Sequence, residues 1–472
     1  MQRRVGRSSR AVSGLAAAVL LAGCVLLAAC DSSSSSGATP SSPPTSSPTS
    51  APTHLPRQTL TFGVVGPRDE VDAYRQMASL FAPLNHRVTV EIRSWPNETA
   101  MMADLRADLR AGRKPPDVFL ASRRDLLWLN QQQVIQPIDQ LLDDRGVDFG
   151  DDYPRSTLTS FGLDNRLDCL PYGVEPSVIY YNKRLVKLGQ VSDDPPVAGQ
   201  GWSLDQFAAT ARWAVSRHPH AAGAYLDPTL GGVAPFVLSG GGQVFEVATP
   251  PTTLTLSSDA SQQALIRTVR VLHRPGISLS PAQLAERTPL QWFESGRLAM
   301  LEDSRHIVPE LRNRLGFEFD VMPMPDLGTP ATVGDLTGLC VSSQASDAGT
   351  AADFLVYASS AEALGYVASQ GYLQPANQAV ALSDDFQQPG RLPQHASVFT
   401  FSVKSMQFPP LIGQWDALDA ATEPTLEQML HGRASQVPPR TREIDQASRK
   451  VLRVEPSGSP SGSPSGSSQP SG

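Results

Sequence analysis

The residue types that support catalysis or metal binding are present in this sequence, but their spacing does not fit those activities. His218 and His220 form the only close histidine pair, and the proline between them and the lack of a nearby acid argue against a metal site. Glu175, Glu302 and Asp303 could supply a general acid and base for glycoside hydrolysis, yet the sequence does not fix their separation. P-loop, zinc-protease and nucleophile-elbow motifs are missing from the body of the chain. We therefore expect a protein that is not an enzyme and needs no cofactor or metal.

Length and charge narrow the class of protein further. The chain has 472 residues, which is too long for one ordinary core and predicts two domains with additional tails. Hydrophobic residues make up 40% of the chain, enough for a substantial core. The net charge is -7, and basic residues cluster only at the N-terminus. A nucleic-acid partner is not expected, because neutralising phosphates needs a concentrated basic face.

The N-terminus has the pattern of an export signal. Four arginines within residues 3–10 precede an uncharged, mostly apolar stretch over residues 11–29. Small residues precede both Cys24 and Cys30, as in the signals of bacterial lipoproteins, whose cysteine becomes the acylated N-terminus. We expect lipidation at Cys30, because polar residues follow it, whereas apolar residues still follow Cys24.

Two alternatives to lipidation at Cys30 remain open at this point. The first is lipidation at Cys24. The second is an uncleaved transmembrane anchor, because the apolar run nearly reaches the roughly 20 residues that span a bilayer. In every case the folded part lies outside the cytoplasm, on the outer face of the bacterial cytoplasmic membrane.

Low-complexity segments flank the folded part. Residues 31–57 are rich in Ser, Pro and Thr, and residues 455–472 repeat Ser, Gly and Pro. Neither segment has enough apolar side chains to form a core, so both are expected to be disordered. The signal peptide over residues 1–30 and these two segments leave residues 58–454 as the folded body.

Strands and helices alternate in the first part of this body. Short apolar runs predict strands over residues 60–65, 88–92 and 117–120, with helical spacing between them over residues 74–81 and 101–109. This order predicts an α/β fold with a mainly parallel, doubly wound sheet, in which ligands bind at the carboxyl ends of the strands. A second region begins near Pro176, and Ser203 and Gln206 there form a capping box at a helix start.

Several short segments occur in an order that resembles the family 1 extracellular solute-binding proteins, the group that contains maltose-binding protein. The resemblance extends over residues 60–449, and the closest match reads Leu-Pro-Tyr-Gly-Val-Glu-Pro-Ser-Val-Ile-Tyr-Tyr-Asn-Lys. It implies an α/β fold of two periplasmic-binding-protein-like lobes, with two doubly wound sheets joined by hinge strands and the ligand between the lobes. The segments that carry the resemblance are residues 112–118, 170–183, 201–207, 293–300, 319–325 and 334–339.

The resemblance also implies domain boundaries and a function. We expect an N-terminal lobe of residues 58–174 and 338–383 and a C-terminal lobe of residues 175–337 and 384–454. The function implied is that of a monomeric, membrane-anchored substrate-binding component of an ABC importer, with a small solute as ligand and membrane permease subunits as partners. A sensor or scaffold lipoprotein with the same fold is one alternative, and a cell-surface hydrolase is another.

The cysteines of the body and the candidate ligand contacts follow from the same resemblance. The sequence alone leaves Cys169 and Cys340 either bridged or as separate thiols, whereas the resemblance places their strands side by side and implies a disulfide. Glu175 matches an acid that contacts sugar hydroxyls, and Trp415 matches an aromatic residue that stacks on sugar rings. The other expected contacts lie where the family has loops near the ligand: Trp95, Arg123, Arg124, Asp303, Arg305, His306 and Asp335.

The nature of the solute stays open at this stage. A carboxylate with an aromatic plate suits a neutral sugar or sugar derivative. The arginines would also suit an anionic ligand such as a phosphorylated polyol, because guanidinium groups bind phosphate through paired hydrogen bonds. The small number of aromatic residues argues against a long glucan.

Overall fold

The computed structural model describes residues 57–149 and 152–453. The expected signal peptide, both candidate lipidation cysteines (Cys24 and Cys30) and the C-terminal tail lie outside these residues. In the described ranges no helix combines the length and the apolar character that crossing a membrane requires.

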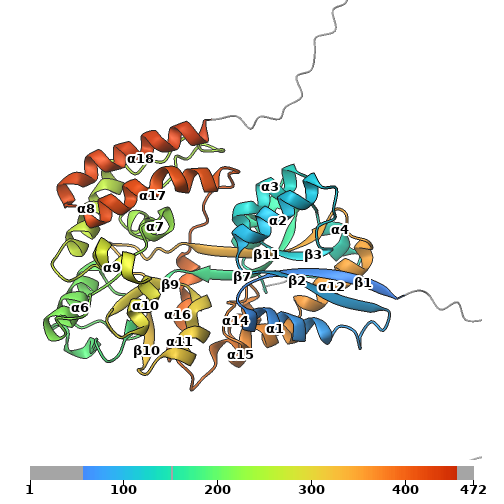
Figure 1. Ribbon diagram of the computed structural model, residues 1–472, viewed down its shortest axis with the longest axis horizontal. Coiled ribbons are helices and arrows are strands. Elements are labelled where there is room, and N and C mark those ends of the chain that lie inside the picture. The colour runs from blue at the N-terminus through green and yellow to red at the C-terminus, as the bar shows by residue number, and fades with distance from the viewer. Residues whose placement is uncertain (1–56, 150–151, 454–472) are drawn as a thin grey trace, which may run out of the picture. The chain divides into compact units, whose positions relative to one another are not determined.

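The first lobe is built on a mixed sheet with helices packed against it (Figure 1). Its strand order is β2-β1-β3-β11-β4, and β7 also pairs with β11. Strands β1, β2 and β3 are parallel, whereas β11 runs antiparallel to β3, β4 and β7. The strands are β1 (Gln58–Val65), β2 (Val88–Trp95), β3 (Val118–Ser122), β4 (Ile135–Gln136), β7 (Cys169–Pro176) and β11 (Gly334–Ser342), and the main helices are α1 (Arg68–Ser79), α2 (Glu98–Arg110), α12 (Ala348–Ala358) and α13 (Ala361–Ser369).

The second lobe has a three-stranded antiparallel sheet in the order β10-β8-β9. Alternate residues of β8 enter different cores: Val178 and Tyr180 belong to one apolar cluster, and Ile179 and Tyr181 belong to the other. This alternation follows from the two-residue period of a strand. The strands are β8 (Val178–Asn182), β9 (Met300–Asp303) and β10 (Phe319–Pro323).

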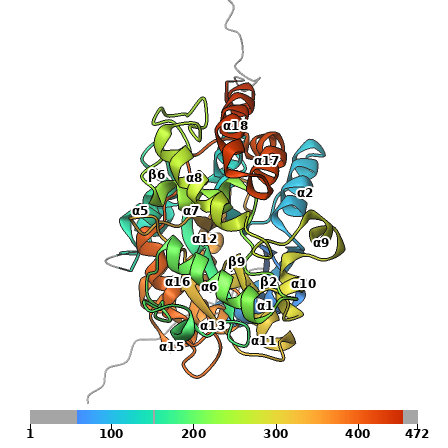
Figure 2. The same ribbon diagram turned by 90° about the vertical axis from the view of Figure 1, so that its left-hand side faces the viewer.

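Helices cover both faces of this second sheet. On one side α17 and α18 pack against each other and against α8, an arrangement visible in Figures 1 and 2. The predicted capping box is present at the start of α6, where the Ser203 hydroxyl accepts from the Gln206 backbone N–H and the Gln206 side chain accepts from the Ser203 backbone N–H. The helices are α6 (Leu204–Arg217), α7 (Leu230–Ser239), α8 (Asp259–Leu272), α10 (Pro289–Glu294), α11 (Val308–Arg314), α16 (Ser397–Ser402), α17 (Trp415–His431) and α18 (Val437–Leu452).

Short elements connect these layers. They are η1 (Arg123–Asp125), α3 (Leu126–Gln131), α4 (Asp139–Asp143), α5 (Arg155–Ser160), β5 (Gly162–Leu163), β6 (Arg166–Leu167), η2 (Leu188–Gln190), α9 (Pro281–Glu286), η3 (Arg305–Ile307), α14 (Gln378–Ala381), α15 (Asp384–Gln387), η4 (Val403–Ser405) and η5 (Ala434–Gln436).

The two sheets are joined at the paired strands β7 and β11. Only Ser177 separates β7 in the first sheet from β8 in the second, and β11 is the return from β10 to the first sheet. The antiparallel register pairs Pro176 with Gly334 at one end and Cys169 with Cys340 at the other. We refer to the end at Pro176 and Gly334 as the crossing.

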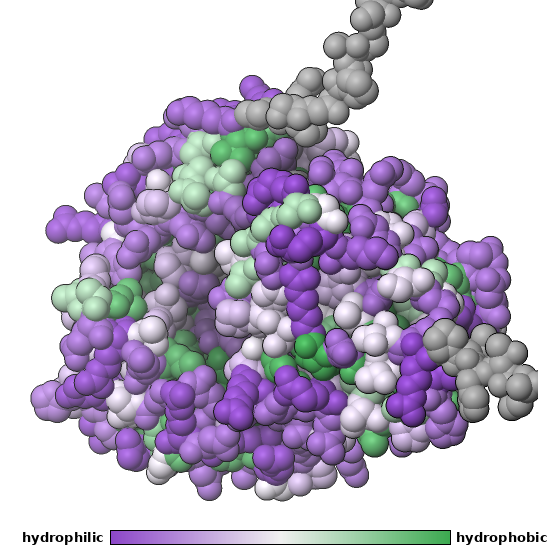
Figure 3. Space-filling model, turned by 45° about the vertical axis from the view of Figure 1, so that its right-hand side comes forward, coloured by the Kyte–Doolittle hydropathy of each residue, from purple (hydrophilic) through white to green (hydrophobic). Residues whose placement is uncertain are grey.

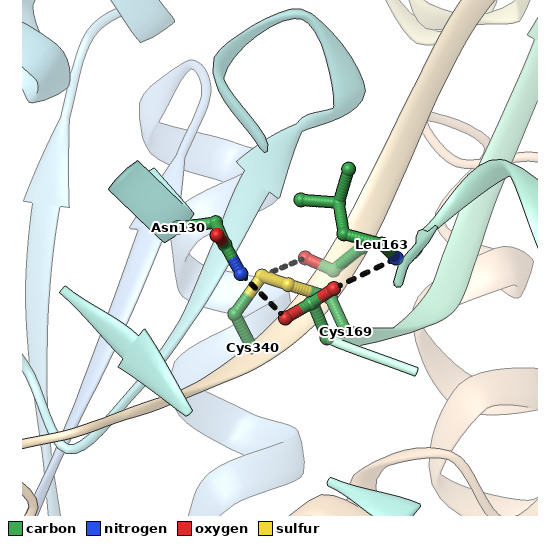
Figure 4. The surroundings of a disulfide bond; sticks show 6 residues. Asn130, Leu163, Cys169 and Cys340 are labelled. Carbon is green, nitrogen blue, oxygen red and sulfur yellow. Dashed lines mark hydrogen bonds between the residues drawn. A yellow bond between two sulfur atoms is a disulfide. The ribbon is translucent and has the colours of Figure 1, made fainter. Parts of the chain in front are cut away.

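Cys169 and Cys340 form a disulfide at the far end of this pair, with their Cα atoms 4.4 Å apart. The preceding residue, Asp168, is buried, and its carboxylate accepts hydrogen bonds from the Asn130 side chain and the Leu163 backbone (Figure 4). Both oxygens of the Asp168 carboxylate therefore accept a hydrogen bond, and this end of the pair is cross-linked.

Candidate functional site

Two carboxylates face each other at the crossing. Glu175 on β7 and Asp335 on β11 are register partners in the antiparallel pair. Directly opposed like charges destabilise a sheet, so this arrangement is not one that stability alone would favour. Both residues were expected at the site from the sequence, and the strand register brings them together.

The segment after β9 reaches the same point. The Ser304 hydroxyl donates to Glu175 Oε2 at 2.9 Å and also lies 2.8 Å from His306 Nδ1. The Ser304 backbone N–H donates to Asp303 Oδ1, and His306 Nδ1 is 3.6 Å from that oxygen. The expected residues Asp303 and His306 thus join Glu175, with Ser304 linking the segment after β9 to β7.

Two further acids lie near Glu175, and the sequence analysis missed both. Glu70 is in the first turn of α1, which follows the carboxyl end of β1, and Glu98 is in the first turn of α2, which follows β2. Gly66 lets the chain turn tightly before α1, since a Cβ there would overlap the Glu70 carboxylate. The rule that ligands bind at the carboxyl ends of parallel strands was the signal that could have identified them.

Burial and mutual repulsion raise the pKa values of these acids. Burial, followed by the charge of Glu175, raises the pKa of Glu70 to about 8. Burial, followed by the charge of Asp335, raises the pKa of Glu98 to about 8. The pKa of Glu175 rises to about 7, mainly through burial, while His306 and the Ser304 hydrogen bond oppose the rise.

We call Glu70, Glu98, Glu175, Asp303 and Asp335 the acidic cluster. Burial also raises the pKa of Asp303. Near neutral pH the cluster therefore holds protonated and ionised carboxyl groups side by side, so it can both donate and accept hydrogen bonds. Among the described residues, no group of three or more metal-ligating side chains is arranged to hold an ion.

Trp415 begins α17 and lies at the edge of this region. Its side chain is 9% exposed, and Phe245 packs edge-on against it with ring centres 5.7 Å apart. The guanidinium of Arg124 lies over the ring, 4.7 Å from its centre, and pairs with Asp419. Arg124 opposes the rise in the pKa of Glu98, which places the Trp415 region within electrostatic reach of the acidic cluster.

Arg305 does not lie where the sequence analysis placed it. The side chain is fully buried, donates to the carbonyl oxygens of Gly371 at 3.1 Å and Phe386 at 3.2 Å, and lies between the rings of Phe386 and Phe399. Its guanidinium is part of the core, so Arg305 is not part of the candidate site.

Arg123 and Trp95 also have other partners. Arg123 donates to the carbonyl oxygens of Ser160 and Pro409, which fixes the end of β3 to the segment before α17. Trp95 is 7% exposed, and its indole N–H donates to Asp104 Oδ2 at 2.8 Å. Neither side chain offers a group to the acidic cluster, so we leave both out of the candidate site.

A surface cavity of about 300 Å³ lies elsewhere, between the first residues of β1 and the start of α12. Gln58, Asp117 and Asp347 are among the residues that line it. The cavity lies at the amino-terminal end of β1, whereas the acidic cluster lies near the carboxyl ends of β1 and β2. No residue of the acidic cluster lines the cavity.

Comparisons with known proteins agree with this architecture. The family model described as "Bacterial extracellular solute-binding protein" matches residues 76–394. No curated protein matches the sequence.

Solved structures with the same fold include several receptors. One is the ABC substrate-binding protein Lmo0181 from Listeria monocytogenes with cycloalternan (TM-score 0.72, 18% identity, covering 84% of this chain and 100% of that one). Another is the GacH receptor of Streptomyces glaucescens, solved with acarbose (TM-score 0.69, 18% identity, covering 84% of this chain and 99% of that one). A third is UgpB from Mycobacterium tuberculosis with glycerophosphocholine (TM-score 0.68, 18% identity, covering 84% of this chain and 98% of that one). These likenesses confirm the two-lobed α/β fold.

Proposed function

The chain belongs to the bacterial extracellular solute-binding protein family, and on this premise we propose that it is the receptor of an ABC importer for a small neutral sugar or sugar-like solute. The family consists of binding proteins rather than enzymes. The observation that carries the proposal is the meeting of Glu175 and Asp335 on the two strands that join the lobes, with Ser304 from the second lobe bonded to Glu175.

The charges of the acidic cluster favour a neutral ligand. A sugar presents hydroxyl groups that donate to carboxylates and accept from protonated carboxyls, and the raised pKa values supply both forms near neutral pH. A phosphorylated solute would meet repulsion from these acids. On the sequence alone, Arg123 and Arg305 favoured an anionic ligand. In the structure, both guanidinium groups donate to backbone carbonyl oxygens instead.

The ligand position proposed is the space between the lobes. Its contacts would be Glu175, Asp303, His306 and Asp335, with Trp415 as the aromatic plate. The face drawn in Figure 3 has a hollow bordered by hydrophilic and some apolar side chains, a surface that suits a sugar. Cycloalternan and acarbose, the ligands of two of the similar receptors, also support a sugar-like solute.

The remaining parts of the proposal concern the organisation of the protein. We propose lobes of residues 58–174 with 338–383 and of residues 175–337 with 384–454, moving about the crossing when solute binds. We further propose a monomer anchored outside the cytoplasmic membrane by a lipid on Cys30, with Cys24 as the alternative, that delivers solute to permease subunits.

Thermal melting of the full chain in detergent tests this function. Maltose and other neutral mono- and disaccharides are compared with sugar phosphates, and a ligand at 100 times its Kd should add about 2.7 kcal/mol to the free energy of unfolding. The shift should vanish in Glu175→Ala and persist in the control Glu443→Gln, an exposed glutamate of α18. A shift with sugar phosphates alone would contradict the neutral ligand, and no shift with any solute would favour a sensor or scaffold.

A further inference from the structure

Arg124 occupies the aromatic face that the proposed function assigns to a sugar. Its guanidinium lies 4.7 Å from the centre of the Trp415 ring and pairs with Asp419 one turn further along α17. Arg124 is in η1, directly after β3, and is 295 residues before its partner Asp419. The contact therefore joins a strand end of the first lobe to the N-terminal part of a second-lobe helix, α17.

The rest of the Trp415 ring has little free surface. Phe245 approaches it edge-on at an interplanar angle of 80°, and the whole side chain is 9% exposed. A sugar ring that stacks on Trp415 therefore needs the face that Arg124 covers. The Arg124 side chain itself is 40% exposed, so it can move into solvent without disturbing the core.

We propose that Arg124 is an internal competitor for the site formed by Trp415 and Asp419, and that solute binding replaces its guanidinium with a sugar ring. The proposal rests on the proposed function. The exchange is chemically matched, because the ring attracts either a cation or the weakly apolar face of a sugar, and the carboxylate accepts from either N–H or O–H groups. A solute must therefore bind strongly enough to displace the Arg124 guanidinium.

Removal of this competitor should strengthen sugar binding. A cation–π contact and a partly exposed ion pair together are expected to cost the wild-type protein on the order of tenfold in affinity. Arg124→Ala should therefore lower the Kd for a neutral sugar by about that factor. Salt weakens ion pairs, so the wild-type Kd should also fall as salt is added, and this dependence should disappear in the variant.

Arg106 provides a matched control. Its guanidinium lies over Trp128, and its Nη1 is 3.9 Å from Asp416, so it also reaches the first turn of α17 from the first lobe. The ring that Arg106 covers is Trp128, whereas Arg124 covers Trp415. Arg106→Ala should leave the Kd within about twofold of wild type. An equal gain in both variants would mean that loosening α17 is the cause, and would overturn the competition.

A measurement without ligand tests the covering of the ring directly. Acrylamide quenching of Trp415 fluorescence, taken as the difference between each protein and its Trp415→Phe counterpart, should increase in Arg124→Ala and stay unchanged in Arg106→Ala. Unchanged quenching in Arg124→Ala would overturn the inference.

Calorimetric titration of wild-type and variant chains with maltose and the other neutral sugars of the melting panel completes the test. Tighter binding by Arg124→Ala alone supports the competition, whereas sugar binding with an unchanged or weaker Kd in this variant overturns the competition but not the function. Absence of binding by both proteins to every sugar overturns the proposed function and with it the competition.

Discussion

The β7–β11 pair has opposite chemistry at its two ends. At one end the Cys169–Cys340 disulfide links the strands, and the buried carboxylate of Asp168 has two hydrogen-bond donors. At the other end Glu175 and Asp335 oppose each other as like charges. One end of the strand pair is thus cross-linked and has a hydrogen-bonded carboxylate, whereas at the other end two carboxylates repel each other.

This difference separates stability from function within one structural element. Polar groups arranged for stability are paired, whereas groups arranged for binding are kept available at a cost that the surrounding fold must offset. The satisfied end lies in the first lobe, away from the crossing, so it can supply that stability without restricting motion between the lobes. Changes at the two ends should therefore differ in size, and for acidic residues in sign.

The largest effect should come from removal of the disulfide. Cys169 and Cys340 are 171 residues apart, so the bond restricts a long loop of the unfolded chain. Cys169→Ala/Cys340→Ala should lower the free energy of unfolding by about 3 kcal/mol, measured by guanidinium denaturation. The Kd for the sugar should stay within about twofold; a larger change would show that the two ends are not independent.

A smaller loss should follow removal of the buried carboxylate beside the disulfide. Asp168→Ala would leave the Asn130 amide and the Leu163 N–H without their acceptor, at a cost of about 2 kcal/mol in the free energy of unfolding. Asp143→Ala, at an exposed position on α4, is the matched control and should change little. A loss of equal size in both variants would contradict the role of the paired carboxylate.

Part of the architecture could be predicted from the sequence because it depends on local patterns, whereas the antiparallel order of the second sheet could not. Apolar runs predicted β1, β2 and β3, and the Ser203–Gln206 pair predicted the start of α6. The pairing of Cys169 with Cys340 came from the family resemblance and agrees with the bond in the structure. The family resemblance also predicted Glu175 and Asp335 at the site, and the register of β7 and β11 makes them direct partners.

The parts that could not be predicted depend on contacts between distant segments. Asp303 and Arg305 are two residues apart, yet η3 turns Arg305 into a core made by Phe386 and Phe399. Spacing along the sequence contains no information on which side chain faces inward when the partners come from a remote segment. The pairing of Arg124 with Asp419 has the same origin.

Titration of the acidic cluster should make the crossing end sensitive to pH. The pKa of Glu98 is raised to about 8, so the folded protein retains a proton that the unfolded chain loses near the usual carboxyl range. This contribution to stability is full below the unfolded pKa and is lost as pH rises through about 8. Melting temperature should therefore fall between about pH 5 and about pH 8.

Glu98→Gln removes this titration and should flatten the pH profile. Because Glu98 is partly exposed, the gain at about pH 8 should be only on the order of 1 kcal/mol in the free energy of unfolding. Melting curves across this pH range measure the effect, with Glu443→Gln as the control that keeps the wild-type slope. An unchanged slope in Glu98→Gln would assign the pH dependence to other groups.

The smallest effect should be a gain in stability at the crossing. Asp335 is exposed and lies opposite Glu175, so Asp335→Asn removes a like-charge pair while keeping the shape of the side chain. The free energy of unfolding should rise by about 0.5 kcal/mol, whereas Asp168→Ala at the other end lowers it. Denaturation at low and high salt checks the origin, because screening should shrink the gain. A loss of stability in Asp335→Asn would mean that the carboxylate is paired in the ligand-free protein. The carboxylates at both ends of the strand pair would then have favourable partners, and the contrast between the ends would be lost.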